Sequence, residues 1–230
     1  TDNLKLDLER RDFTINAMAY NDKRGLIDEF EGIKDLKDGI IRCVGDAGQR
    51  FDEDALRMLR AVRFAGQLGF EIDDNTRNAI VQRADRLENI SAERIRVELT
   101  KLLVAKEAGR LRDAYSTGMT RYFLPELDKA MVTEQKNPHH IYTVGEHSIH
   151  GIEIMNCFFE VTSDRKMYDK VPEKIMSTAK KIAKKMNKKQ HTILCMAMLL
   201  HDIAKPVVMT VDDDGTGHFY GHPQESEKMA

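Results

Sequence analysis

The chain has 230 residues, of which 41% are hydrophobic and 32% are charged, with 36 Lys and Arg against 38 Asp and Glu. This length suffices for one large domain or two modest ones, and the formal net charge of −2 neither indicates nor excludes a nucleic-acid partner. The three cysteines, Cys43, Cys157 and Cys195, lie far apart without metal-ligand spacing, which excludes a zinc ribbon or disulfide framework and favours a reducing cytoplasm. No run of eighteen apolar residues is present, so we expect no membrane span, no secretion signal and no membrane partner.

The first fifty residues combine charge clusters with short β-favouring stretches. These stretches, at 25–28 and 39–45, are separated by turn residues. The pattern predicts the remnant of a small sheet with a helix attached. Because the chain opens at Thr1 within a charged segment, we interpret it as a fragment.

A helical period follows from Asp52 to about residue 106. We predict three helices, at 52–69, 74–87 and 91–104, with Asp52 and Ser91 as N-terminal caps. Their short connections favour a helical bundle.

A second helical region is predicted to begin at Thr143. Thr143 and Glu146 have the spacing of a capping box, and Asn137-Pro138 just before them makes a reasonable domain boundary. Further on, Lys180–Lys189 contains six lysines, which we interpret as a solvated helix face, with an RNA-facing patch as the alternative. The apolar run Ile193–Leu200 predicts a buried helix.

Asp54, Arg57, Arg60 and Arg63 recur at every third residue, with apolar side chains between them. Three residues are close to one helical turn, so the four side chains should share one face. Three neighbouring arginines repel one another and need an anionic partner, for which phosphate is the obvious candidate.

The pair Asp54 and Arg57 also matches the hydrogen-bonding edge of a nucleobase. A carboxylate can accept from the exocyclic amine of C or A, while a guanidinium donates to the adjoining ring nitrogen or carbonyl. The alternative is an i,i+3 salt bridge worth about 0.2–0.5 kcal/mol.

Three segments resemble a known family. Asp7–Ala19 resembles the arginine-rich motif of class II tRNA nucleotidyltransferases, the CCA-adding enzymes, and of the related bacterial poly(A) polymerases. Leu26–Gly32 is similar to the strand and turn that follow this motif. Glu53-Asp54-x-x-Arg57 resembles the family's base-recognition motif and continues into further arginines as the family does.

The resemblance implies a CCA-adding tRNA nucleotidyltransferase that acts on the tRNA 3′ end with CTP and ATP. Asp54 and Arg57 would select the nucleotide, and Arg11, Arg60 and Arg63 would hold its phosphates and sugar. An A-adding enzyme, a poly(A) polymerase and a non-catalytic tRNA-binding module remain alternatives.

The family's two Mg²⁺ ions are held by strand carboxylates upstream of the arginine-rich motif, beside a glycine-rich loop. Only ten residues precede Arg11, and the acid clusters at 52–54 and 212–214 are expected at a helix start and in a turn. We therefore expect no catalytic residue of nucleotidyl transfer in this chain, and no transfer activity from it alone.

His201-Asp202, with His147 upstream and Gly221-His222 downstream, resembles the HD phosphohydrolase domain. The resemblance implies a divalent metal such as Ni²⁺, Mn²⁺, Fe²⁺ or Zn²⁺ bound by His147, His201 and Asp202. The later aspartate of that domain is not seen before Ala230. A metal-dependent phosphohydrolase acting on nucleotides or 2′,3′-cyclic phosphates is therefore a further alternative.

Three other histidines, His139, His140 and His150, are expected to be surface or packing residues.

The predicted fold is mainly α: a helical neck and body bundle and an HD-type helical domain, preceded by a small α/β remnant of a nucleotidyltransferase head. The expected domains are residues 1–50 for the head remnant, 51–137 for the neck and body with the base-recognition helix, and 138–230 for the HD-type domain.

Overall fold

A computed structural model describes residues 4–136, 141–159, 161 and 171–230. The chain forms two compact units. Unit 1 consists of Thr1–Leu102 and Arg112–Phe123, and unit 2 of Leu103–Leu111 and Leu124–Ala230.

This division differs from the three predicted segments. Segment 1–50 and most of 51–137 share unit 1, whereas residues 124–137 group with segment 138–230. The assignment of the segments to head, neck and HD-type domain stays a prediction, and the proposed boundary at 137–138 lies outside the described residues.

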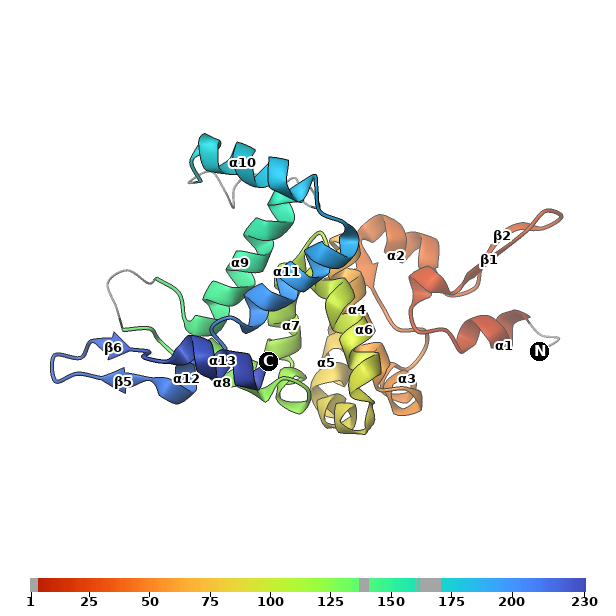
Figure 1. Cartoon of the computed structure of the whole chain (residues 1–230). Coiled ribbons are helices and arrows are strands. Elements are labelled where there is room, and N and C mark those ends of the chain that lie inside the picture. The colour runs from red at the N-terminus through yellow and green to blue at the C-terminus, as the bar shows by residue number, and fades with distance from the viewer. Residues whose placement is uncertain (1–3, 137–140, 160, 162–170) are drawn as a thin grey trace. The chain divides into compact units, whose positions relative to one another are not determined.

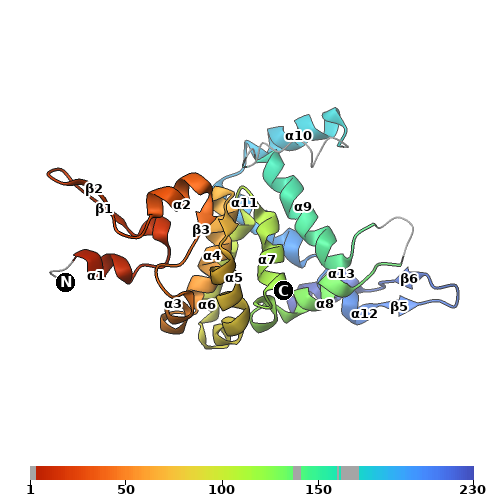
Figure 2. The same ribbon diagram turned by 180° about the vertical axis from the view of Figure 1, so that it is seen from behind.

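The described structure is mainly helical, which confirms the predicted fold class. Unit 1 contains two separate strand pairs: β1 (Met18–Asn21) runs antiparallel to β2 (Gly25–Asp28), and β3 (Ile40–Ile41) runs parallel to β4 (Glu71–Ile72). The sequence predicted β2 and the region of β3 but not their partners. The β1–β2 hairpin extends away from the helices of this unit (Figures 1 and 2).

The helices of unit 1 follow in chain order, with the unit boundary falling within the ends of α6 and α7. They are α1 (Leu4–Glu9), η1 (Thr14–Asn16), α2 (Gly32–Asp38), α3 (Ala47–Glu53), α4 (Leu56–Leu68), α5 (Asp74–Arg83), η2 (Ala84–Asn89), α6 (Ala92–Leu103), α7 (Leu111–Ser116) and η4 (Thr120–Tyr122). The helices predicted at 74–87 and 91–104 correspond to α5 with η2 and to α6.

The turn before α2 explains the sequence Leu26–Gly32. The Asp28 carboxylate accepts hydrogen bonds from the backbone N–H groups of Gly32 and Ile33, both at 2.8 Å, and so satisfies the start of the helix. A Cβ on Gly32 would lie 2.3 Å from the carbonyl oxygen of Thr14, so only glycine fits there.

The helix predicted from Asp52 to Gly69 is two helices. Asp46 caps α3 by accepting from the N–H of Gln49, so Asp52 lies inside this helix and its predicted role as a cap is wrong. The chain then extends at Asp54 (φ −154°, ψ 102°) before α4 begins. At Gly69, φ is 72°, and α4 ends there as predicted.

The core of unit 1 is built on α4. The buried side chains of this helix are Leu56, Met58, Leu59, Ala61, Val62, Arg63 and Ala65. Spacings of three and four residues place most of the apolar ones on one side of the helix, and burial of each large side chain stabilises the fold by about 1.5–3 kcal/mol.

Unit 2 is arranged around α9, against which α8, α10, α11 and η3 pack. Its elements are η3 (Ala108–Arg110), α8 (Pro125–Val132), α9 (Val144–Phe158), α10 (Glu173–Ala183), α11 (Lys188–Leu200), α12 (Lys205–Val208), the antiparallel strands β5 (Thr210–Val211) and β6 (Gly217–His218), and α13 (His222–Met229).

Two local predictions hold in unit 2. Thr143 caps α9, and its side chain accepts from the N–H of Glu146. The acidic residues 212–214 lie between β5 and β6, in the region of the hairpin turn.

The apolar run Ile193–Leu200 is helical as predicted, but it is only partly buried. Cys195 and Leu199 are buried, whereas Ile193 is 56% exposed. An unbroken apolar run places apolar side chains on every side of a helix, and only one side of α11 packs against α9.

By length and composition alone, the helical segment Lys188–Val208 could cross a membrane, contrary to the expectation from the sequence. Core helices meet the same requirement. Asp202 and Lys205 within this segment are buried and paired with each other, and Cys195 and Leu199 are buried as well. No membrane-spanning role follows from this segment.

Candidate nucleotide pocket and metal centre

A polar pocket of about 450 Å³ in unit 1 brings together four of the five residues predicted to bind the nucleotide. It is lined by Arg10, Arg11, Asp12, Asn16, Asp54, Leu56, Arg57, Arg60 and Arg94. Its volume lies within the usual range for small-molecule sites, about 300–1,000 Å³. Five arginines against two aspartates favour an anionic ligand.

Asp54 occupies the break between α3 and α4. One carboxylate oxygen accepts from the N–H of Leu56 at 3.2 Å, and the other accepts from the Arg94 guanidinium at 2.8 Å. The carboxylate is thus oriented from two sides while its side chain stays 30% exposed. Arg94, on α6, was not identified from the sequence, because forty residues separate it from Asp54.

Arg57 is held in the first turn of α4. Its Nη1 donates to Glu53 at 2.8 Å and to the carbonyl of Arg50, and its Nη2 donates to the carbonyl of Arg10 at 2.9 Å. Among the described residues three of its five N–H groups have partners, so two can serve a ligand.

The i,i+3 salt bridge considered as the alternative does not form between Asp54 and Arg57 in the described chain, since each pairs with another residue.

Arg60 finds its anion within the protein. Both Nε and Nη2 donate to one oxygen of the buried Asp12, whose other oxygen accepts from Phe13 N–H and the Asn16 amide. Asp12, inside the arginine-rich segment, was not predicted to play this role. Arg11, by contrast, is exposed and pairs only loosely with Asp7, at 3.3 Å.

Arg63 does not line the pocket. Its Nε donates to Glu98 and its Nη1 to Gln67, and the guanidinium stacks 3.6 Å from the centroid of the Phe64 ring. Burial lowers the pKa of Arg63, an effect that the Glu98 carboxylate opposes. The structure gives Arg63 a carboxylate partner in place of the predicted phosphate.

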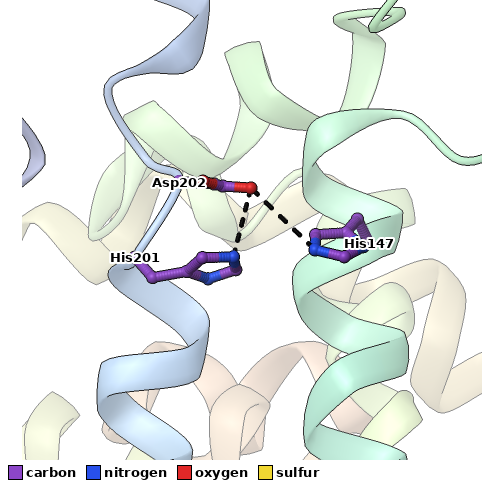
Figure 3. Close-up of side chains that lie close together, drawn as sticks. All are labelled: His147, His201 and Asp202. Atoms are coloured by element: carbon purple, nitrogen blue, oxygen red, sulfur yellow. Dashed lines mark ion pairs between the residues drawn. The ribbon is translucent and has the colours of Figure 1, made fainter. Parts of the chain in front are cut away.

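In unit 2, the three residues predicted to bind metal lie together (Figure 3). His147 comes from α9, and His201-Asp202 follows directly after α11. The Nε2 atoms of His201 and His147 lie 3.1 and 3.9 Å from the same oxygen of Asp202.

His222, which the sequence places downstream of the predicted ligands but does not mark as one of them, joins this group. Its Nε2 lies 3.3 Å from the other oxygen of Asp202. The Nδ1 atoms of His201 and His222 each lie 2.8 Å from a backbone carbonyl, of Met198 and Phe219 respectively. A ring that donates at Nδ1 presents a lone pair at Nε2 unless it is protonated, so the group requires either added protons or a cation.

Lys205 supplies one positive charge to the group. Its buried Nζ lies 2.8 Å from Asp202 and donates to the Gln135 amide oxygen at 2.7 Å. Burial alone would raise the pKa of Asp202, but hydrogen bonds from His201 and Lys205 outweigh it and hold that pKa well below its usual range. The hydrogen bond to Asp202 in turn raises the pKa of His201.

The group fits a divalent cation in its donor chemistry. Two ligand atoms at about 2.1 Å from one ion are at most about 4.2 Å apart, which the two distances to Asp202 satisfy. All three ligand atoms lie within 4.8 Å of one another, so the rings need only a small movement to close on an ion.

His150 pairs with Glu153 at 3.4 Å and contacts the Tyr142 ring, which matches the expected packing role. His139 and His140 lie outside the described residues.

Family models match both halves of unit 1. One, described as the poly A polymerase head domain, covers residues 1–42, and another, described as the probable RNA and SrmB-binding site of polymerase A, covers residues 69–131. The chain is also 48% identical over 122 residues to the CCA-adding enzyme of Leuconostoc mesenteroides and 52% identical over 126 residues to that of Bacillus licheniformis. The chain belongs to the family of CCA-adding enzymes and poly(A) polymerases.

These two sequence matches cover 53–54% of the chain but only 30–32% of the relatives. The chain therefore matches about a third of the length of these family members.

Solved structures of the family share the fold. The CCA-adding enzyme of Bacillus stearothermophilus in complex with CTP superposes with a TM-score of 0.54 at 28% identity, over 89% of this chain and 54% of that one. A tRNA nucleotidyltransferase complexed with a primer tRNA and an incoming ATP analogue gives a TM-score of 0.61 at 25% identity, over 86% and 50%. The family membership inferred from the motifs is confirmed, whereas the HD-type assignment stays a prediction.

Proposed function

We propose that this chain is the nucleotide-selecting and RNA-binding part of a CCA-adding tRNA nucleotidyltransferase, which acts on the tRNA 3′ end with CTP and ATP in the bacterial cytoplasm. The observation that carries the proposal is the pocket where Asp54 and Arg57 meet three further arginines that can take part in phosphate binding, Arg10, Arg11 and Arg60. Family members with bound CTP, or with a primer tRNA and an ATP analogue, support it.

The geometry gives each residue a separate task. The Asp54 carboxylate, oriented by Arg94, accepts from the exocyclic amine of C or A. Arg57, fixed by two backbone carbonyls, donates to the adjoining base acceptor. The exposed Arg11 and the partly exposed Arg60 attract the triphosphate, since guanidinium groups bind phosphate oxygens in pairs.

The Mg²⁺ ions that the family's reaction uses do not fit the described part of unit 1. Its strand carboxylate Asp28 is occupied by the amides that begin α2, and the only group of metal-ligand type found among the described residues is the one around Asp202. Nucleotide selection and RNA binding are therefore the steps assigned to these residues.

Incorporation of labelled CTP and ATP into a tRNA that lacks its 3′ end tests this proposal. We expect near-zero incorporation by the 230-residue chain, and incorporation once the head of a family member is joined ahead of it. Incorporation by the chain alone would contradict the absence of catalytic carboxylates. Products extended by A alone, or by a long A tail, would assign the A-adding or poly(A) polymerase alternative instead.

A second activity, metal-dependent phosphohydrolysis, is favoured by the group around Asp202. We propose that His147, His201 and Asp202 hold a divalent ion such as Ni²⁺ or Mn²⁺, which when bound would activate a water molecule. His222 orients the Asp202 carboxylate from its second oxygen, and Lys205 places a cation where it can attract a substrate phosphate.

Hydrolysis of a nucleoside 2′,3′-cyclic phosphate in the presence of Ni²⁺ or Mn²⁺ tests this second activity. The His201→Ala variant should lose it, whereas His150→Ala, which changes a histidine outside the group, should retain it. If metal analysis finds no bound ion and His147→Ala changes nothing, the second activity is excluded.

A further inference from the structure

Seven lysines lie close together at the end of α10 and the start of α11. They form the lysine surface, which consists of Lys174, Lys180, Lys181, Lys184, Lys185, Lys188 and Lys189. All are exposed except Lys180, which is half-buried, and residues 174–189 contain no Asp or Glu. None of the seven forms a salt bridge with a carboxylate of the described residues.

The helical period aligns these lysines. Lys174, Lys181 and Lys185 are seven and four residues apart and so lie along one face, with Lys180 and Lys184 on the adjoining strip. The helical hydrogen bonds continue to Lys184 and Lys185, so the stripe is continuous. Eleven residues at 1.5 Å each give it a length of about 16 Å.

The opposite side of α10 packs against α9. Ala183 is buried there, and Met176 and Ala179, which are half-buried, share its side of the helix. The lysines therefore face outward in unit 2, as the position of α10 beside the C-terminal end of α9 shows (Figure 1).

His147 lies near the other end of α9. Eleven residues, about 16 Å of helix, separate it from Phe158. The lysine surface is thus distinct from the group around Asp202.

We infer that the lysine surface binds the phosphate backbone of RNA without reading its sequence. The inference rests on the proposed function, which supplies RNA as the partner. Clustered lysines without carboxylate partners repel one another, and a polyanion relieves this repulsion while releasing its counterions. A stripe of flexible ammonium groups offers point charges for phosphates but no geometry that reads base edges.

RNA fits this surface better than an acidic membrane. A helix that lies on a membrane inserts a whole apolar face. In α10 part of that face packs against α9, and of its large apolar residues only Ile175 and Ile182 are exposed, at 56% and 58%.

The test measures binding of a fluorescent tRNA transcript without its 3′ CCA to the 230-residue chain between 50 and 200 mM salt. The variant carries Lys181→Gln, Lys184→Gln and Lys185→Gln, and the control carries Lys34→Gln, Lys37→Gln and Lys228→Gln, with the same loss of charge. At 0.15 M salt each lost phosphate contact weakens binding about fourfold, so the variant should bind at least about tenfold more weakly, with a salt slope smaller by about two. The control should bind within about twofold of the unchanged chain.

Equal affinities and slopes for variant and control, with unchanged circular dichroism, would overturn the inference. So would loss of binding to phosphatidylserine-containing vesicles in the variant while its tRNA binding stays intact. CTP and ATP binding to the same proteins separates the two proposals. If neither nucleotide binds but tRNA binding depends on the lysine surface, the proposed function fails and the inference stands; nucleotide binding with lysine-independent tRNA binding gives the reverse.

Discussion

Asp54 and Arg57 are three residues apart, yet each is oriented by a different set of neighbours. Arg94 and the backbone orient the carboxylate, while Glu53 and two carbonyls orient the guanidinium. Because neither neutralises the other, both keep hydrogen-bonding capacity for a base edge.

Arg57→Ala should therefore weaken discrimination between CTP or ATP and the other nucleotides. We expect a loss of about 1–3 kcal/mol, the usual value of a bidentate base contact, measured as relative binding of CTP, ATP, GTP and UTP. Arg86→Ala, which removes an exposed arginine outside the pocket, is the matched control. Unchanged preferences in the Arg57 variant would remove the base-reading role.

His191 carries a second prediction at this scale. Its Nε2 lies 2.7 Å from the side-chain oxygen of Asn156, whose amide donates to the carbonyls of Leu103 and Ala105. Since that oxygen can only accept, the ring donates to it. Burial lowers the pKa of His191 below its ordinary value of 6.5.

A folded-state pKa below the unfolded value means that the unfolded chain binds the proton more readily. The free energy of unfolding should thus be highest above pH 6.5 and fall as the pH drops toward the lowered folded value. His191→Gln can keep the donated bond without titrating, so its urea midpoint should vary less between pH 7 and pH 5.5. An equal pH dependence in both proteins would rule out His191 as its source.

At the scale of elements, helix ends were predictable wherever they depend on neighbouring residues. The cap at Thr143, the glycine at the end of α4 and the span of α6 are local features that the sequence shows directly. The break at Asp54 was missed because the helical period continues through it, while Arg94 binds its carboxylate from another helix.

The arginine stripe shows the same limit. Its spacing was read correctly, but its partners were not, because Asp12 lies 48 residues from Arg60 and Glu98 lies 35 residues from Arg63. Without those distant carboxylates in view, phosphate was the obvious anion for all three arginines. Arg63, which pairs with Glu98, instead joins α4 to α6.

Breaking the Arg63–Glu98 pair should be costly, because both side chains are buried. Arg63→Ala leaves the Glu98 carboxylate with only the longer contact to Lys101, and we expect it to lower the free energy of unfolding by about 3 kcal/mol or more. The double variant Arg63→Met with Glu98→Leu removes both charges and should recover most of that loss. Urea denaturation measures both, and a double variant as unstable as the single one would show that the unpaired buried charge is not the source of the loss.

At the scale of the whole molecule, the class of fold was predictable and the division into units was not. Local periodicity indicates helices, but grouping depends on which helices touch, and residues 124–132 form a helix that packs on α9. Only the three-dimensional contacts show that this helix belongs with the group around Asp202 and not with the bundle before it.

Metal binding offers a test of that grouping. The proposed ligands all lie in unit 2, so a divalent ion that binds only the folded state should stabilise that unit, by about 2.7 kcal/mol at a concentration one hundred times its Kd. Ni²⁺ or Mn²⁺ should then raise the midpoint of the thermal transition that reports on unit 2, followed by hydrogen exchange of the α9 and α11 amides, while amides of α4 gain less. In His201→Ala the shift should vanish, and in His150→Ala it should persist. A shift that is equal across both units, or that survives in His201→Ala, would show that the ion acts elsewhere, since stabilisation by a ligand is confined to the structure that must unfold to release it.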